Sequence, residues 1–256
     1  MESEGASGSQ STAVRPRKWA LAVLALVLCG AASALAALHV RRDHLQERLL
    51  RLEPDAAGRD AVLVRFAAQQ ARPLYAAHCA ACHGSDMRGS RVLGAPDLTD
   101  GVWLYGDGSV YEIERTILFG IRSGAGAAHN VSEMPPFGLT GRLSQGEIRA
   151  LVQYVRRLSG LPHDAQQAND GKALWGANCS DCHGFDARGN NDYGAPDLTQ
   201  NVWNNGGDPQ SLYNAIYFGQ HHIMPAWFGV LTLEQIRALA VYIHSVSHPP
   251  RTARVP

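Results

Sequence analysis

Net charge is absent from this 256-residue chain, because 23 Lys and Arg residues balance 23 Asp and Glu residues. Without a basic excess, a general role in binding nucleic acid has no electrostatic support. Cysteine is scarce: there are five, and four of them form two closely spaced pairs. No thiols remain for a disulfide framework. Methionine occurs only four times, which leaves few candidates for a thioether ligand.

The two cysteine pairs both belong to the pattern Cys-x-x-Cys-His, at Cys79–His83 and at Cys179–His183. This is the attachment pattern of c-type haem, in which two thiols bond to the vinyl groups and the histidine binds the iron. Zinc sites and thiol–disulfide centres use the same thiol spacing, but the adjoining histidines and the wide separation of the pairs disfavour both. The sequence predicts two covalently bound haem c groups, attached through Cys79, Cys82, Cys179 and Cys182.

One long apolar run, Trp19–Leu38, contains no charged residue. As a helix it would be roughly 30 Å long, which matches the hydrocarbon core of a membrane. Basic residues flank both ends, so charge alone does not orient it. We expect a retained transmembrane anchor. The alternative is a cleaved signal peptide with small residues near Ala34 and Ala36.

An internal repeat surrounds the two cysteine patterns. Residues 94–99 and 194–199 both read Gly-Ala-Pro-Asp-Leu-Thr, and Trp103 is matched by Trp203. Each copy predicts three helices: one that ends in the cysteine pattern, a middle helix and a last helix with an apolar stripe. Helix N-terminal signals stand at Ser109, Ser144, Asp208 and Thr232. The predicted fold class is all-α, with two tandem cytochrome c domains of class I type after a single N-terminal transmembrane helix.

The same features predict the domain boundaries. We expect a cytoplasmic disordered tail at 1–18, the anchor at 19–38, a helical spacer at 39–68 that breaks near Pro54, the first cytochrome c domain at 69–159, a linker at 160–169, the second domain at 170–248 and a C-terminal tail at 249–256.

A haem that carries electrons needs a second axial ligand. One methionine starts the N-terminal tail, and Met87 follows His83 too closely to reach the opposite face of the haem. The remaining two precede proline at equivalent places in the repeats, so we assign His83 with Met134 to the first iron and His183 with Met224 to the second. Thioether ligation favours ferrous iron and raises the reduction potential. No catalytic residue is predicted.

Other histidines could compete as ligands. Three lie near the methionine loops, where we expect surface or supporting roles: His129, His221 and His222. Six more have no matching partner and should face solvent: His39, His44, His78, His163, His244 and His248. Three aromatic residues should pack against the haem edges or close the pockets: Trp103, Tyr105 and Trp203. Asp97 and Asp197 should hold their loops through local backbone hydrogen bonds.

The block at 94–100, followed by residues 103–106, resembles the dihaem cytochrome c subunit of cbb3-type cytochrome c oxidases, the subunit III type. Residues 223–227 are similar to that family's distal methionine loop, and the resemblance covers roughly residues 74–245. It implies a single-pass protein of the bacterial inner membrane with periplasmic haem domains, whose iron ligands fall on His83, Met134, His183 and Met224.

The resemblance also implies a non-catalytic electron-transfer subunit. Its donor would be the cytochrome bc complex or a soluble cytochrome c, and its acceptor the core subunits of a haem–copper oxidase. Two alternatives stay open. One is a free-standing, membrane-anchored carrier similar to cytochrome c4, serving another oxidase or reductase. The other is a dihaem peroxidase, which would need an iron with a displaceable ligand.

Overall fold

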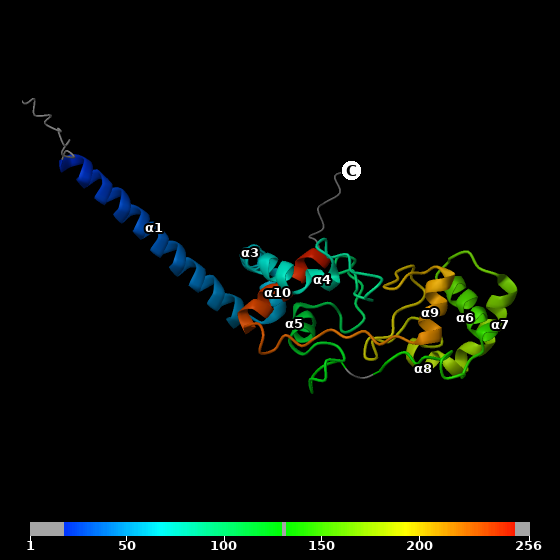
Figure 1. The fold of residues 1–256 in the computed structure, drawn as a ribbon. Helices are drawn as coiled ribbons and strands as arrows, with labels where there is room; N and C mark the ends of the chain where they lie inside the picture. The colour runs from blue at the N-terminus through cyan, green and yellow to red at the C-terminus, as the bar shows by residue number, and fades with distance from the viewer. Residues whose placement is uncertain (1–17, 130–131, 249–256) are drawn as a thin grey trace, which may run out of the picture. The chain divides into compact units, whose positions relative to one another are not determined.

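The structure is a computed structural model that describes residues 18–129 and 132–248. Over these residues it is helical, with only isolated β-bridges between loops, which confirms the all-α fold class. The predicted tails fall outside the described residues, apart from Lys18. The helices, shown in Figure 1, are α1 (Lys18–Arg51), α2 (Pro54–Arg59), α3 (Ala61–His78), α4 (Ala80–His83), α5 (Val110–Phe119), α6 (Gln145–Leu158), α7 (Ala165–Asn178), α8 (Ser180–His183), α9 (Pro209–Phe218) and α10 (Leu233–Ser247).

Helix α1 contains the predicted anchor and is much longer than it. It continues through half of the predicted spacer and ends at Arg51. Among the described helices, α1 is the one long and apolar enough to cross a membrane. The chain divides into two compact units at this helix: Met1–Glu47 forms one, and Arg48–Pro256 forms the other.

The second half of the predicted spacer packs within the folded unit, ahead of the domain boundary expected at residue 69. Pro54 begins α2 instead of merely breaking a helix. Asp60 caps α3 by accepting hydrogen bonds from the Val62 and Leu63 amides, at 2.9 and 3.1 Å. Helix α3 then buries an apolar face made of Leu63, Phe66, Ala67, Ala71 and Tyr75. The apolar residues between 62 and 66 are thus core residues of a globular lobe.

Two helical lobes make up the unit that follows, and each takes its last helix from the other repeat. Helix α10 packs against α2, α3 and α5, whereas α6 packs against α7 and α9. We call α2–α5 with α10 the first lobe, and α6–α9 the second lobe; both groups can be followed in Figure 1. The predicted domains at 69–159 and 170–248 therefore describe sequence repeats but not packing units.

The exchange is made by two segments that run side by side between the lobes. One follows α5 and the other follows α9. Ile121 and Met224 exchange two backbone hydrogen bonds of 3.0 Å, and the Gln220 amide donates to the Met134 carbonyl at 3.1 Å. Gly120 and Gly219 end the helices at φ +73° and +74°, and a Cβ on either would overlap the backbone carbonyl of Met224 or Met134. Glycine therefore permits this close approach.

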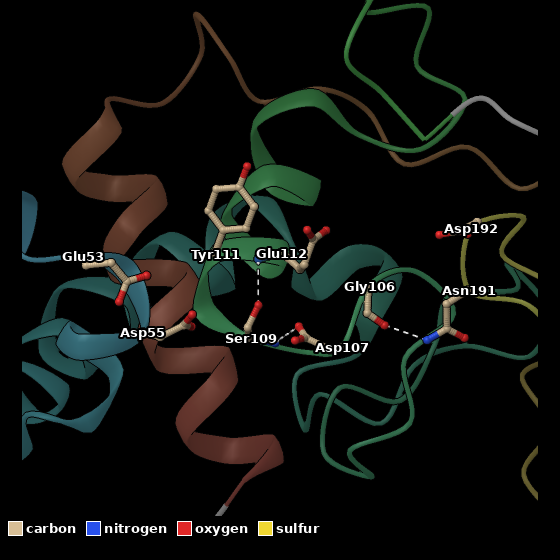
Figure 2. Close-up of a pocket in the computed structure, with 9 residues that line it drawn as sticks. All are labelled: Glu53, Asp55, Gly106, Asp107, Ser109, Tyr111, Glu112, Asn191 and Asp192. Carbon is tan, nitrogen blue, oxygen red and sulfur yellow. Dashed lines mark hydrogen bonds between the residues drawn. The ribbon is translucent and has the colours of Figure 1, made fainter.

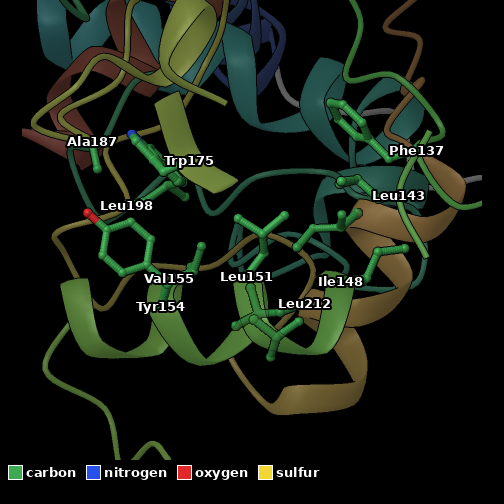
Figure 3. Packing of buried hydrophobic residues seen from close by; sticks show 12 residues of the cluster. Phe137, Leu143, Ile148, Leu151, Tyr154, Val155, Trp175, Ala187, Leu198 and Leu212 are labelled. Carbon is green, nitrogen blue, oxygen red and sulfur yellow. The ribbon is translucent and has the colours of Figure 1, made fainter. Parts of the chain in front are cut away.

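Apolar stripes on the last helices form the cores, as the sequence predicts. In the second lobe, the buried α6 residues Ile148, Leu151 and Val155 meet Trp175 of α7 and Leu212 of α9 (Figure 3). The corresponding α10 residues of the first lobe are also buried: Ile236, Leu239, Ala240 and Ile243. Because the apolar stripes of α6 and α10 have the same helical spacing, either helix can pack against the other helices of either lobe.

The predicted helix starts are observed at the expected residues. Ser144 with Glu147 and Thr232 with Gln235 form complete capping boxes. At Ser109 only the hydroxyl half is present, accepting a hydrogen bond from the Glu112 amide at 3.3 Å. Asp208 caps α9, and Pro209 occupies its first turn. Local capping chemistry is therefore sufficient to place these four helices.

A buried ion pair joins α10 to α5 and to the end of α1. Arg237 Nε lies 2.5 Å from Glu114 Oε2, and the two side chains are only 10% and 12% exposed. Arg237 Nη1 also donates to the carbonyls of Leu49 and Leu52, at 3.1 and 3.0 Å. The last carbonyls of a helix lack partners within the helix, so the guanidinium satisfies them and complements the helix dipole.

Two glycines of α7 test the contact between α6 and α7. A Cβ on Gly171 would overlap the Ala150 carbonyl of α6, whereas a Cβ on the exposed Gly176 would meet only Phe185 at 3.6 Å. Alanine favours a helix over glycine by about 1 kcal/mol. We expect Gly176→Ala to gain up to that amount and Gly171→Ala to lose about 1–3 kcal/mol through overpacking. Thermal unfolding of both variants measures the difference; equal stabilisation would contradict the close helix contact.

Candidate metal centres

The cysteines and the histidine of each motif share one helical face. Helix α3 ends at His78, and the Cys79 amide still donates to the Tyr75 carbonyl at 2.8 Å. The short helix α4 follows and carries Cys82 and His83. Residues three and four apart lie on the same side of a helix, so both thiols and the imidazole face one way. Helix α8 repeats this arrangement in the second lobe.

A proline carbonyl orients each motif histidine. His83 Nδ1 lies 3.3 Å from the Pro96 carbonyl oxygen, and His183 Nδ1 lies 3.2 Å from that of Pro196. Because a carbonyl oxygen only accepts hydrogen bonds, Nδ1 carries the proton and Nε2 keeps its lone pair for a metal. Burial lowers the pKa of both imidazoles, against the raising effect of these hydrogen bonds. Both rings are therefore held neutral, which is the metal-binding form.

The Gly-Ala-Pro-Asp-Leu-Thr loops place those carbonyls. Asp97 Oδ1 accepts hydrogen bonds from the Thr99 amide and hydroxyl, at 2.7 and 2.6 Å. Asp197 does the same with Thr199, at 2.8 and 2.6 Å. These contacts confirm the local role predicted for the two aspartates. The motif signal in the sequence was clear, but the use of the proline carbonyl was not predicted.

Burial disfavours the thiolate form of the first cysteine in each motif. It raises the pKa of Cys79 to about 11, with a smaller contribution from Cys82. It also raises the pKa of Cys179 to about 11, although Arg142 opposes the shift. Reactive thiols of disulfide-exchange centres have lowered pKa values instead. The raised pKa values of Cys79 and Cys179 therefore argue against a disulfide-exchange centre.

The methionines are distributed differently from the prediction. Met134 packs against the core of the second lobe, where Cys179 and Trp203 pack as well. The backbone of Met224 pairs with that of Ile121 just after α5, and three residues later the Trp227 ring lies 5.2 Å from that of His78 in the first lobe.

The pairing of His83 with Met134 and of His183 with Met224 stays a prediction, and the packing of the two methionine segments does not favour it. Met224 lies in the lobe of His83, and Met134 lies in the lobe of His183. The cause is the exchange of segments between the repeats, which carries each methionine across together with the helix that follows it.

The tryptophans provide a test of whether a haem group fits. Trp203 packs on the second core, and its Nε1 donates to Asn201 Oδ1 at 2.7 Å. Trp103 Nε1 is buried and has no hydrogen-bond partner among the described residues; the first repeat has Gly101 where the second has Asn201. A buried donor without an acceptor costs free energy. A carboxylate of a bound haem would supply the acceptor, so this side chain fits such a group.

The remaining histidines follow the predictions only in part. His129 stacks on Tyr105 with ring centroids 4.6 Å apart, and His221 pairs with Glu133 at 2.7 Å. Both contacts suit the expected supporting roles. His244 was expected to face solvent, but its Nδ1 is buried without a hydrogen-bond partner in the described part of the chain, and its ring stacks on His248. That expectation is wrong because α10 is buried in the first lobe.

A cavity of about 640 Å³ lies away from both cysteine motifs (Figure 2). Most of its side chains are acidic; it is lined by Glu53, Asp55, Gly106, Asp107, Ser109, Tyr111, Glu112, Asn191 and Asp192. Three of the carboxylates already accept backbone hydrogen bonds, from Ala56, Val110 and Ser109. These three carboxylates thus hold helix and turn ends, and we assign no reactive centre to this cavity.

Comparison with known families identifies the class of protein. The family model described as cytochrome C oxidase, cbb3-type, subunit III matches residues 66–155 and 166–243, which include both motifs. The chain belongs to this family. As a member of a cytochrome c family it binds c-type haem, and the apolar α1 anchors it to a membrane.

Individual relatives agree with this assignment. A cbb3-type cytochrome c oxidase subunit CcoP from Cereibacter sphaeroides is 35% identical over 202 residues, which are 79% of this chain and 69% of the relative. A subunit FixP from Bradyrhizobium sp. strain ORS 278 is 39% identical over 189 residues, which are 73% of this chain and 64% of the relative. A subunit CcoP from Rhodobacter capsulatus is 34% identical over 210 residues, 79% and 70% of the two chains.

Proposed function

We propose that this chain is the membrane-anchored dihaem cytochrome c subunit of a cbb3-type oxidase, and that it passes electrons toward a haem–copper core. The observation that carries this proposal is the presence of one complete attachment motif in each lobe, each with its histidine oriented by a proline carbonyl. The similarity to CcoP and FixP subunits supports the assignment to an oxidase over a free-standing carrier.

The two lobes would each hold one haem, which supplies a one-electron centre when bound. Cys79 and Cys82 would attach the first, and Cys179 and Cys182 the second. The exchanged segments would place His83 opposite Met224 and His183 opposite Met134. A methionine available to each lobe favours electron transfer over peroxidase chemistry, because a peroxidase needs an open or displaceable position on one iron.

The direction of electron flow and the location follow from the same assignment. Attachment of c-type haem is completed outside the cytoplasm, so both lobes would lie in the periplasm and the N-terminus in the cytoplasm of a bacterium. Electrons would arrive from the cytochrome bc complex or from a soluble cytochrome c. The lobes would correspond to two cytochrome c domains, preceded by the anchor within 19–38.

Purification from native membranes in mild detergent tests this proposal. We expect two c-type haems per chain, and we expect b-type haem and cytochrome c-driven oxygen uptake to elute with them. As a control for haem number, the paired variant Cys179→Ala with Cys182→Ala should retain one haem. A chain that elutes alone with two c-type haems and no oxygen uptake would instead be an anchored carrier of the cytochrome c4 kind.

A further inference from the structure

Arg122 lies where the segment that carries Met134 meets the segment that carries Met224, and we call these the two methionine segments. It directly follows Ile121, whose backbone pairs with Met224. Its own amide donates to the His129 carbonyl at 3.1 Å. The side chain is half-buried between segments that belong to both repeats.

The guanidinium of Arg122 donates hydrogen bonds to both methionine segments at equivalent points. Nε donates to the His222 carbonyl at 2.8 Å, and Nη1 donates to the Ser132 carbonyl at 2.9 Å. Ser132 stands two residues before Met134, and His222 stands two residues before Met224. One side chain therefore links the backbones of both segments, each at a residue two positions before a methionine.

A third contact fixes the orientation of the guanidinium. Nη1 also donates to the Tyr105 hydroxyl at 3.0 Å, and the Tyr105 ring stacks on His129. The Tyr105 hydroxyl in turn lies against Gly194, at the start of the loop that carries Pro196. The planar fork of arginine suits several acceptors at fixed angles, which the single ammonium of lysine does not.

The backbone of Arg122 is held in an uncommon conformation. Its φ is +50°, and among the described residues only Met87 and Ala187 share a positive φ without being glycine. A residue in the left-handed region costs free energy and persists only where the surroundings fix it. Here the three side-chain hydrogen bonds and the pairing of the neighbouring residue provide that constraint.

Arg122 also brings an uncompensated positive charge to the junction. All three of its side-chain acceptors are neutral, and no carboxylate in residues 18–129 or 132–248 lies within ion-pair distance of it. A partly buried cation is only weakly screened by salt. It therefore disfavours the extra positive charge of ferric iron relative to ferrous iron on either side.

We propose that Arg122 is a positioning residue for both methionine ligands, and that its charge raises the reduction potential of both haems. The inference rests on the proposed function, because it requires a methionine-ligated haem in each lobe. It adds that the two distal ligands depend on one shared side chain. A change at residue 122 should consequently affect both irons, whereas a change at either methionine should affect one.

The test compares Arg122→Gln, Arg122→Lys and, as a matched charge control, the exposed Arg149→Gln in the full-length chain with both haems attached. Three quantities are measured: carbon monoxide binding by each reduced haem, the far-red absorption band of methionine-ligated ferric haem, and the reduction potentials. For Arg122→Gln we expect carbon monoxide binding at both haems and weakening of the band. We also expect a shift of roughly tenfold toward ferric iron at fixed ambient potential, which is about 59 mV for one electron.

The lysine variant separates charge from geometry. We expect Arg122→Lys to keep potentials close to native, because the charge remains, and still to admit carbon monoxide at both haems, because the fork is lost. If Arg122→Gln fails to fold, carbon monoxide binding by the Arg122→Lys variant tests the positioning role by itself. Unchanged carbon monoxide exclusion, an effect on one haem only, or an equal shift in Arg149→Gln would overturn the inference. A native chain that already binds carbon monoxide at both haems would instead overturn the proposed ligation itself.

Discussion

Replacing Met224 with alanine is expected to open the iron of the first lobe, the one attached through Cys79 and Cys82, and to leave the iron of the second lobe closed. Met134→Ala should do the reverse. The reason is that each methionine crosses to the other repeat's motif with the segment that carries it. Loss of the thioether should also lower the potential of the affected haem, since soft ligation favours ferrous iron.

Chains with a single haem make this assignment unambiguous. In a chain with Cys179→Ala and Cys182→Ala, only the first-lobe haem remains. There, Met224→Ala should give complete carbon monoxide binding on reduction, and Met134→Ala should give little. Met87→Ala serves as a control for packing damage, because Met87 is buried in the first lobe but follows its histidine too closely to ligate. If carbon monoxide binds in the Met134→Ala chain instead, the result would contradict the exchanged assignment and would support ligation of His83 and Met134 to the same iron.

Loss of the buried ion pair at Arg237 should produce the largest loss of stability. Arg237→Met leaves the Glu114 carboxylate buried without its partner, and it also removes the donor to the Leu49 and Leu52 carbonyls. Removing one member of a buried pair costs about 3–5 kcal/mol. We expect a loss of that size, measured by thermal or urea unfolding of the haem-loaded chain.

Two further variants identify the source of this loss. Arg188→Met removes an exposed pair with Asp186, whose side chains are 73% and 68% exposed, and should cost about 1 kcal/mol or less. The double variant Arg237→Met with Glu114→Leu removes both charges, so it should recover a large part of the loss. If Arg237→Met costs no more than Arg188→Met, the ion pair does not contribute to the core of the first lobe.

Local signals in the sequence were enough to place most of the helices. Ser144, Thr232 and Asp208 begin helices because each satisfies free backbone amides within three residues, which neighbouring sequence alone determines. The exchange of α6 and α10 could not be predicted in this way. Both helices carry an apolar stripe of the same spacing, so the sequence does not distinguish packing on their own repeat from packing on the other.

In the candidate site, too, the residues of a contiguous motif could be predicted, whereas residues with partners far away in the sequence could not. The attachment residues and the motif histidines could be identified because they form a contiguous pattern. Arg122 and Arg237 could not, since their partners lie as far away as residues 222 and 49 and no motif marks them. The spacer was misjudged for a related reason: helix α3, which buries Leu63 and Phe66, packs against a helix that begins at residue 233.

The exchanged helices also impose an order on synthesis. A chain grows from its N-terminus, so Cys79–His83 is made long before the helix that completes its lobe. Until residues 233–247 have emerged, α3 and α5 lack the helix against which they mainly pack, and until residue 224 has emerged its methionine is not in place. The first lobe is thus the first to be started and the last to be closed. A chain that stops after the second motif would have both attachment sequences and no complete first lobe.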